Sequence, residues 1–328
     1  MSIRVHRTFA HMTMLNCFMV DLQLLQTLRV LHVQGTVTAT ARALHMSPSA
    51  VSQQLRRLAA EAGADLLRSE GRRVQFTAAG HVLLRHADLL CSQWERAVSE
   101  LAEEAGSPRR TLSLGGFATS IGTLLAPAAR RLNQAQRPTA TVLQEAGTRE
   151  CYEKLLAGEI DLAVLTPLPG GPSLDDPRFE QYVLMDDLMD LAVPADHRLA
   201  AQSTVDLADA STEDWIAPHH DHTRLIESLC SAAGFAPKFV HRADAWHAVL
   251  CLVSQGFGVC LVPRLAPSPS PDVARVRLRG EPPPFRRILA CVRSGTGQDP
   301  TVSDGIDALR QQAHRHASGG AHAHRGLD

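Results

Sequence analysis

The segment between Thr36 and Ala60 constrains the fold of this chain more than any other part of it. Thr36 and Ser47 are typical N-cap residues, and the proline after Ser47 favours the first turn of a helix. The pattern therefore predicts two short helices separated by a turn at His45-Met46. The apolar face of the second helix consists of Val51, Leu55 and Leu58. Its opposite face carries Ser49, Ser52, Gln53 and Arg56.

These polar side chains are of the types that read the major groove of DNA. Gln pairs with adenine through two hydrogen bonds, Arg pairs with guanine, and Ser suits a base or a phosphate. A preceding helix between Asp21 and Gly35 completes a three-helix unit. The spacing alone also allows a small helical bundle whose outward face happens to be polar.

A hairpin with two cations at its tip is predicted after the helices. Short apolar segments at 66–68 and 74–76 flank Gly71-Arg72-Arg73. Such a wing can place guanidinium groups along phosphates or in a narrow minor groove. Between Leu22 and His86 eight arginines stand against three acids, a net charge of +5 within a nearly neutral chain. An anionic partner explains this excess, and a bias of composition toward arginine explains it equally well.

The sequence TATARALHMSPSAVSQQLRRL at 38–58, followed by GRRVQFTAAG at 71–80, closely resembles the winged helix-turn-helix of the LysR-type transcriptional regulators. The resemblance continues more loosely to about residue 315. The family usually has an aromatic residue and then an arginine before the wing, whereas Leu67-Arg68-Ser69 places the arginine one position early. This departure puts one phosphate contact in doubt. The candidate DNA-binding residues are Thr38, Ser47, Ser49, Ser52, Gln53, Arg56, Arg57, Arg72 and Arg73.

A heptad pattern predicts that the next helix, at 81–106, pairs with a second copy of the chain. Leucine, alanine and tryptophan follow at alternating steps of four and three residues, at Leu83, Ala87, Leu90, Trp94, Ala97 and Leu101. Packing of this helix on its own domain is the alternative. The resemblance to the LysR family implies a linker helix here and an assembly of dimers or tetramers.

From Thr111 onward strands and helices alternate, which implies parallel sheets with helical crossovers. The resemblance implies a two-lobed, periplasmic-binding-protein-like α/β effector domain, with lobe 1 at 111–165 plus 286–315 and lobe 2 at 166–285. The expected fold class is thus α/β with an N-terminal winged helix-turn-helix at 21–80 and a long linker helix. We expect residues 1–20 to be a disordered extension from an upstream-extended start, or else a short ordered arm. Residues 316–328 are expected to be a disordered tail.

Ligands of open α/β sheets bind beyond the carboxyl ends of the strands. Thr119 and Ser120 follow the first strand of lobe 1, and Thr148 follows its second strand. Their hydroxyls can bind a carboxylate or phosphate, or simply cap their helices. The candidate effector-binding residues are Thr119, Ser120, Thr148, His219, His220 and Trp246, the last three because imidazoles and an indole suit an aromatic or acidic ligand. We expect no metal at His219–His222, because adjacent residues rarely converge on one ion.

The remaining features favour a regulator over an enzyme or a receptor. The sequence contains no G-x-S-x-G, H-E-x-x-H or G-x-x-x-x-G-K motif, so we expect no catalytic residue and no cofactor. Seven scattered cysteines fit a reducing cytoplasm, and no apolar run has the length of a membrane span. The expected partners are double-stranded DNA, a small organic effector, a second copy of the chain and, as a further candidate, RNA polymerase. A solute receptor with an unrelated N-terminal domain, or an enzyme on a two-lobed scaffold, are the rival classes.

Overall fold

The structure is a computed structural model that describes residues 21–70, 73–104, 111–168, 170–218, 220–267 and 270–322. Its N-terminal unit consists of α2 (Leu22–Gln34), α3 (Val37–Ala43), α4 (Pro48–Ala62) and an antiparallel hairpin of β1 (Leu67–Glu70) and β2 (Arg73–Phe76). The caps lie where the sequence predicts them: the side chains of Asp21, Thr36 and Ser47 accept hydrogen bonds from the first turns of α2, α3 and α4. Gly35 ends α2 in the left-handed conformation, with φ 68°. The winged helix-turn-helix is therefore confirmed.

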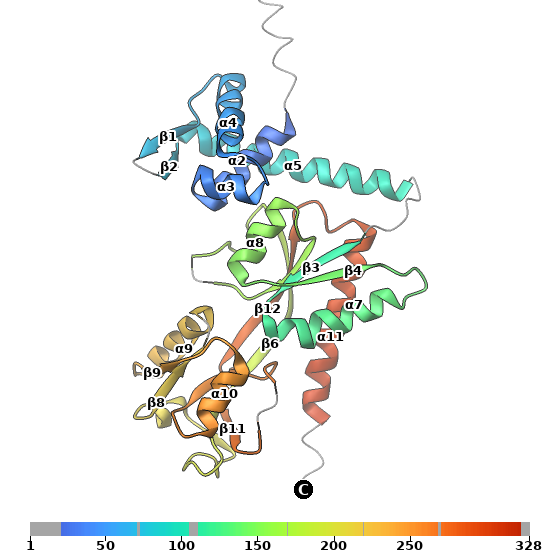
Figure 1. Cartoon of the computed structure of the whole chain (residues 1–328). Helices are drawn as coiled ribbons and strands as arrows, with labels where there is room; N and C mark the ends of the chain where they lie inside the picture. The colour runs from blue at the N-terminus through green and yellow to red at the C-terminus, as the bar shows by residue number, and fades with distance from the viewer. Residues whose placement is uncertain are drawn as a thin grey trace, which may run out of the picture.

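The first half of helix α5 (Ala78–Glu104) packs into the core of this unit, and its second half extends away from it (Figure 1). Leu84, Ala87 and Cys91 are buried with the leucines of α2 and α4. The predicted heptad seam is thus wrong at Ala87, which is fully buried in its own domain, and Leu83 also packs partly on that core. At the start of α5 a Cβ on Gly80 would lie 2.1 Å from the carbonyl oxygen of Leu66, so only glycine permits this approach of helix and hairpin.

Lobe 1 is a mixed sheet with helices on both faces. Its strand order is β4 (Thr141–Glu145), β3 (Leu112–Gly116), β5 (Leu162–Leu165), β12 (Phe285–Arg293) and β6 (Phe179–Pro194). The first three strands are parallel to one another, and β12 is antiparallel to β5 and β6. Helices α7 (Ala126–Asn133) and α11 (Pro300–His322) enclose one apolar cluster, and α8 (Thr148–Ala157) encloses another.

Lobe 2 repeats this arrangement around the second half of β6. Strands β10 (Cys260–Pro263) and β11 (Val273–Leu278) pair with β6 on either side, and β7 (Thr204–Val205) follows β11. Strands β8 (Asp214–Ala217) and β9 (Lys238–Arg242) are parallel, and a bridge from Trp215 to Val259 joins β8 to β10. The 3-10 turn η3 (Leu207–Ala210) and the helices α9 (His220–Ala232) and α10 (Trp246–Ser254) complete the lobe. The core of this lobe surrounds the fully buried Trp215.

The predicted α/β fold class is confirmed, whereas two predicted boundaries differ from the structure. The first part of β6, which pairs with β12 from Phe179 to Leu188, belongs to the lobe 1 sheet although it falls inside the range predicted for lobe 2. Helix α11 continues to His322, so residues 316–322 are helical where a disordered tail was expected. The predicted extension at 1–20 and the residues 323–328 lie outside the described residues.

Replacing Gly80 by alanine should destabilise the N-terminal unit by about 1–3 kcal/mol, because the new methyl group overlaps the Leu66 carbonyl. Urea unfolding followed by circular dichroism measures this loss. Gly122→Ala is the matched control, since nothing lies within 4 Å of a Cβ at Gly122. A Gly80→Ala protein as stable as the control would contradict the close packing of α5 on the hairpin.

Candidate DNA-binding and effector-binding sites

Helix α4 presents one face outward because its other face forms the core of the N-terminal unit. Val51, Leu55 and Leu58 are buried against α2. The Ser47 hydroxyl accepts a hydrogen bond from the Ala50 amide at 3.1 Å, which fixes the start of the helix. The side chains opposite the buried face are therefore held on a rigid element.

The structure brings the predicted base-reading residues together on this outward face. Ser49, Gln53 and Arg56 are exposed, and Thr38 is exposed on α3. All three predicted serines have local partners: the Ser47 hydroxyl lies 2.9 Å from that of Ser49, and the Ser52 hydroxyl donates to the Pro48 carbonyl at 2.9 Å. Gln53 and Arg56 are thus the long side chains that this face offers to a groove.

The two adjacent arginines of α4 differ in their surroundings. Arg57 donates through Nε to Glu61 at 2.8 Å and lies 3.5 Å from the Asp21 carboxylate. Arg56 makes no ion pair among the described residues. Both remain predicted DNA contacts, but only Arg56 presents an uncompensated charge.

The wing is described in part. Arg72 lies outside the described residues, and Arg73 begins β2 with a side chain that is also outside them. Arg68, at the position where the sequence departs from the family pattern, donates to Gln75 Oε1 through Nε at 3.0 Å and Nη2 at 2.7 Å. This arginine therefore spans the hairpin, and its early position has a structural partner.

The three hydroxyls predicted for the effector in lobe 1 all follow parallel strands, but they have different surroundings. The Thr119 hydroxyl accepts a hydrogen bond from Arg286 Nη2 at 3.0 Å. Ser120 is fully buried, and its hydroxyl donates to the Phe117 carbonyl at 2.7 Å, so it is already bonded to the backbone of its own turn. Thr148 starts α8 and lies 3.4 Å from both the hydroxyl and the amide of Thr166, at the end of β5. Thr119 is the residue with a charged neighbour.

Two of the three residues predicted in lobe 2, His220 and Trp246, begin α9 and α10. His219 lies outside the described residues, and the side chain of His220 does as well. Trp246 is half-buried and packs edge-to-face on His222, with ring centroids 5.0 Å apart. His222 itself is buried, with Nε2 3.1 Å from the Leu261 carbonyl oxygen. Within the described residues no group of histidine, cysteine, aspartate or glutamate side chains could hold a metal ion.

Sequence reasoning missed a pair of buried charges beside Thr119. Arg286 of β12 donates to Asp187 of β6 through Nε at 2.9 Å, and its guanidinium lies 4.8 Å from the centre of the Phe117 ring. The side chains of Arg286 and Asp187 are 10% and 1% exposed. Burial raises the pKa of the Asp187 carboxyl above its ordinary value, against the opposing effect of Arg286. The sequence does contain a signal for this contact, because it has two adjacent acids, Asp186-Asp187, and two adjacent arginines, Arg286-Arg287. In the structure these two pairs lie opposite each other on β6 and β12.

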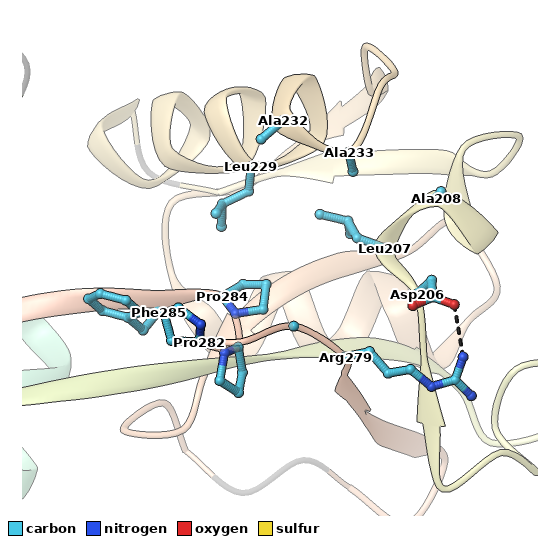
Figure 2. A pocket seen from close by; sticks show the side chains of 12 residues that line it. Asp206, Leu207, Ala208, Leu229, Ala232, Ala233, Arg279, Pro282, Pro284 and Phe285 are labelled. Carbon is cyan, nitrogen blue, oxygen red and sulfur yellow. Dashed lines mark hydrogen bonds and ion pairs between the residues drawn. The ribbon is translucent and has the colours of Figure 1, made fainter.

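A hollow of about 530 Å³ lies elsewhere in lobe 2 (Figure 2). It lies between η3, the end of α9 and the segment before β12, and the ion pair between Arg279 and Asp206 borders it at 2.8 Å. Its walls are mostly leucine, alanine and proline side chains, from Leu207, Leu229, Ala232, Ala233, Pro282, Pro283 and Pro284. None of the predicted effector residues lines it, so it is separate from the predicted site.

Two known families match the chain, and together they cover both of its parts. The bacterial regulatory helix-turn-helix family of lysR type matches residues 22–81, and the LysR substrate binding domain matches residues 105–314. The chain belongs to the LysR family of transcription regulators. It is a non-enzymatic DNA-binding regulator with an effector-binding domain.

Relatives and solved structures agree with this assignment. The chain is 28% identical over 235 residues to the HTH-type transcriptional regulator AlsR of Bacillus subtilis, covering 69% of this chain and 74% of AlsR. It is 26% identical to a hydrogen peroxide-inducible genes activator of Dickeya chrysanthemi, over 84% of this chain and 90% of that protein. The fold is similar to that of full-length CbnR in complex with its target DNA, with a TM-score of 0.54, 23% identity, and coverage of 90% of this chain and 100% of CbnR. No helix among the described residues is long and apolar enough to cross a membrane.

Replacing Arg56 of this LysR regulator by alanine should weaken operator binding by about 1–3 kcal/mol and relax specificity at one base pair. The physical reason is that its exposed guanidinium has no ion-pair partner among the described residues and can bond to a guanine. Mobility shifts on the DNA upstream of its own gene, with single-base variants of the site, measure both effects.

Arg57→Ala is the matched control, because it removes the same charge from the next position of the same helix. Its guanidinium is already paired with Glu61 and Asp21, so we expect a smaller loss that is uniform across DNA sequences. Equal loss of specificity in the two variants would contradict the assignment of Arg56 as the base-reading arginine.

Proposed function

We propose that this LysR regulator binds its operator as a dimer or tetramer, and that an acidic small molecule held between its lobes controls the binding or bending of DNA. The observation that carries the DNA part is the exposed pair of Gln53 and Arg56 on a helix whose opposite face is buried. Phosphate contacts from Arg72 and Arg73 belong to the same proposal, and so does action in the cytoplasm.

The contact between Thr119 and Arg286 supports an acidic effector. Arg286 reaches the Thr119 hydroxyl through Nη2 and Asp187 through Nε, while Nη1 makes no hydrogen bond to the described residues. A carboxylate that accepts from the Thr119 hydroxyl and this guanidinium would form charge-assisted hydrogen bonds. Around the same strands two aspartates face three arginines: Asp187 pairs with Arg286, and Asp190 lies near both Arg264 and Arg275. An anionic ligand would balance the remaining positive charge.

The buried thiols of the described residues favour a bound effector over oxidation at their positions. Some relatives are named hydrogen peroxide-inducible activators, which raises the question of a reactive cysteine. Five of the six described cysteines are buried, and burial raises the pKa of the Cys151 and Cys230 thiols to about 12. A thiol reacts as its thiolate, so these groups are poor candidates for oxidation.

An exposed apolar stripe on α5 supports self-assembly. Leu90, Trp94 and Leu101 are 46%, 56% and 65% exposed, and Val98 is exposed beside them. Leu90, Trp94 and Leu101 belong to the predicted heptad seam, whereas Ala87 and Cys91 lie on a neighbouring face that is buried in their own domain. Pairing of two such stripes removes this apolar surface from water.

Thr119→Val should abolish the response to an acidic effector and leave operator binding intact. Benzoate and butyrate, each with its uncharged amide, serve as probes in thermal-shift and mobility-shift measurements. We expect the acids, but not the amides, to raise the melting temperature of the wild-type protein, because only a carboxylate pairs with the guanidinium.

The control is Thr141→Val, which removes an exposed hydroxyl from the edge of the same sheet and should change nothing. Stabilisation by the amides as strong as that by the acids would argue against an anionic effector. Ser120→Val is less informative than the sequence suggests, since it removes a buried hydrogen bond to the Phe117 carbonyl.

Trp94→Glu combined with Leu101→Glu should split the dimer, because two carboxylates would be buried without partners on pairing. Sedimentation equilibrium of the full chain at micromolar concentration measures the mass. Phe257→Glu is the control, as it places the same charge on an exposed apolar residue of lobe 2. A double variant that sediments with the mass of the wild type would place the subunit interface elsewhere.

A further inference from the structure

The N-terminal unit is seated on the C-terminal end of α8, a contact that lies outside both sites described above. In Figure 1, α8 lies between α2 and α3 on one side and the lobe 1 sheet on the other. The carbonyl of Leu156, in the last turn of α8, accepts a hydrogen bond from the side-chain amide of Gln26 in α2. The last carbonyls of a helix have no partners within it, so α2 supplies a cap from another domain.

Gln26 is one end of a polar chain that leads from α8 to α5. Its Oε1 accepts a hydrogen bond from Arg29 Nη1 at 3.1 Å, and Arg29 Nε donates to Asp88 Oδ1 at 2.8 Å. The side chains of Arg29 and Asp88 are only 2% and 6% exposed. Removing one member of a buried ion pair leaves an uncompensated charge, so this pair holds Gln26 in its position.

A second arginine fastens the same end of α8 to α5 from lobe 1. Arg293 of β12 donates through Nε to both carboxylate oxygens of Glu95, at 3.0 and 2.9 Å. Its Nη1 donates to the carbonyls of Leu155 at 2.9 Å and Ile160 at 3.2 Å. Asp88 and Glu95 lie seven residues apart, which places both acids on one face of α5.

Apolar packing fills the space between these polar contacts. Val33 of α2 packs against the lobe 1 cluster that contains Cys151 and Leu155 of α8. The side chain of Gln34 also bonds to Glu153, on the preceding turn of α8. This docking surface between α2, α5 and α8 therefore combines the hydrogen bonds of Arg29 and Arg293 with the apolar contact of Val33. It fixes how the DNA-binding unit is oriented on lobe 1.

We propose that α8 transmits the state of the effector site to the DNA-binding unit through this docking surface. Thr148 begins the helix beside Thr166 at the predicted effector site. In its last turn the Leu155 carbonyl accepts from Arg293, the partner of Glu95 in α5, and the Leu156 carbonyl accepts from Gln26 in α2. Ten residues of helix span about 15 Å, so one rigid element joins the two. The proposal rests on the proposed function, because it takes Thr148 as part of the effector site. Docking of each DNA-binding unit on its own α8 sets the spacing between the two α4 helices of a dimer, so a shift of α8 changes that spacing.

Glu95→Gln tests the docking surface in the full chain without any effector. Hydrogen exchange should become faster in both α2 and α8, because the amide cannot replace the charged contact with Arg293. Affinity for a complete operator should fall about fivefold or more, a typical size for coupling between sites, while affinity for a single half-site stays unchanged. Asp307→Asn is the matched control: it removes an exposed ion pair with Arg310 on α11 and should alter neither measurement.

A double-mutant cycle tests the connection along α8. Thr148→Val should change the affinity for the complete operator in the wild-type background and have no further effect in Glu95→Gln, because the undocked helix no longer reaches the DNA-binding unit. Unchanged exchange or operator affinity in Glu95→Gln, an equal loss on the half-site, or additive effects of the two changes would each overturn the proposal. Since no compound is used, these outcomes are independent of whether an acidic effector binds at Thr119.

Discussion

The antiparallel pairing of β6 with β12 is the contact on which the effector domain depends. Strand β6 pairs with β12 through its first half and with β10 and β11 through its second half, so one strand is part of both lobes. The strand carries aspartates into the interior, and a buried carboxylate is tolerated only with a partner. Asp187 is paired with Arg286, and Asp190 with Arg264 at 2.9 Å. One continuous strand therefore joins the two lobes, and two ion pairs lie at their junction.

This junction explains why Thr119 differs from the other hydroxyls predicted for the effector. Ser120 and Thr148 bond to uncharged neighbours within lobe 1, the Phe117 carbonyl and the Thr166 hydroxyl. Thr119 receives its hydrogen bond from Arg286, a residue whose position is set by the register of β12 on β6. An effector that competes for that guanidinium would therefore act directly on the contact between the crossing strands.

The sequence predicts best what depends on neighbouring residues. The caps at Asp21, Thr36 and Ser47 and the two faces of α4 follow from side-chain chemistry within one or two turns, and the structure has them where expected. The fold class follows from the alternation of strands and helices. The contact of Arg286 with Thr119 could not be predicted, because it joins residues 167 positions apart and depends on strand register. The docking of Gln26 on Leu156 is hidden for the same reason, since periodicity does not reveal which domain caps a helix.

The partly wrong seam on α5 separates an observed contact of this helix from a proposed one. A heptad pattern identifies apolar positions but does not say which partner covers them. Ala87 and Cys91 are covered by the unit that precedes the helix, and Asp88 and Glu95 lie on the same inward side. Leu90, Trp94 and Leu101 face away and remain exposed. Because both sets occupy adjacent faces of a single helix, any rotation of α5 that alters the proposed subunit pairing would also alter the ion pairs that hold the DNA-binding unit on lobe 1.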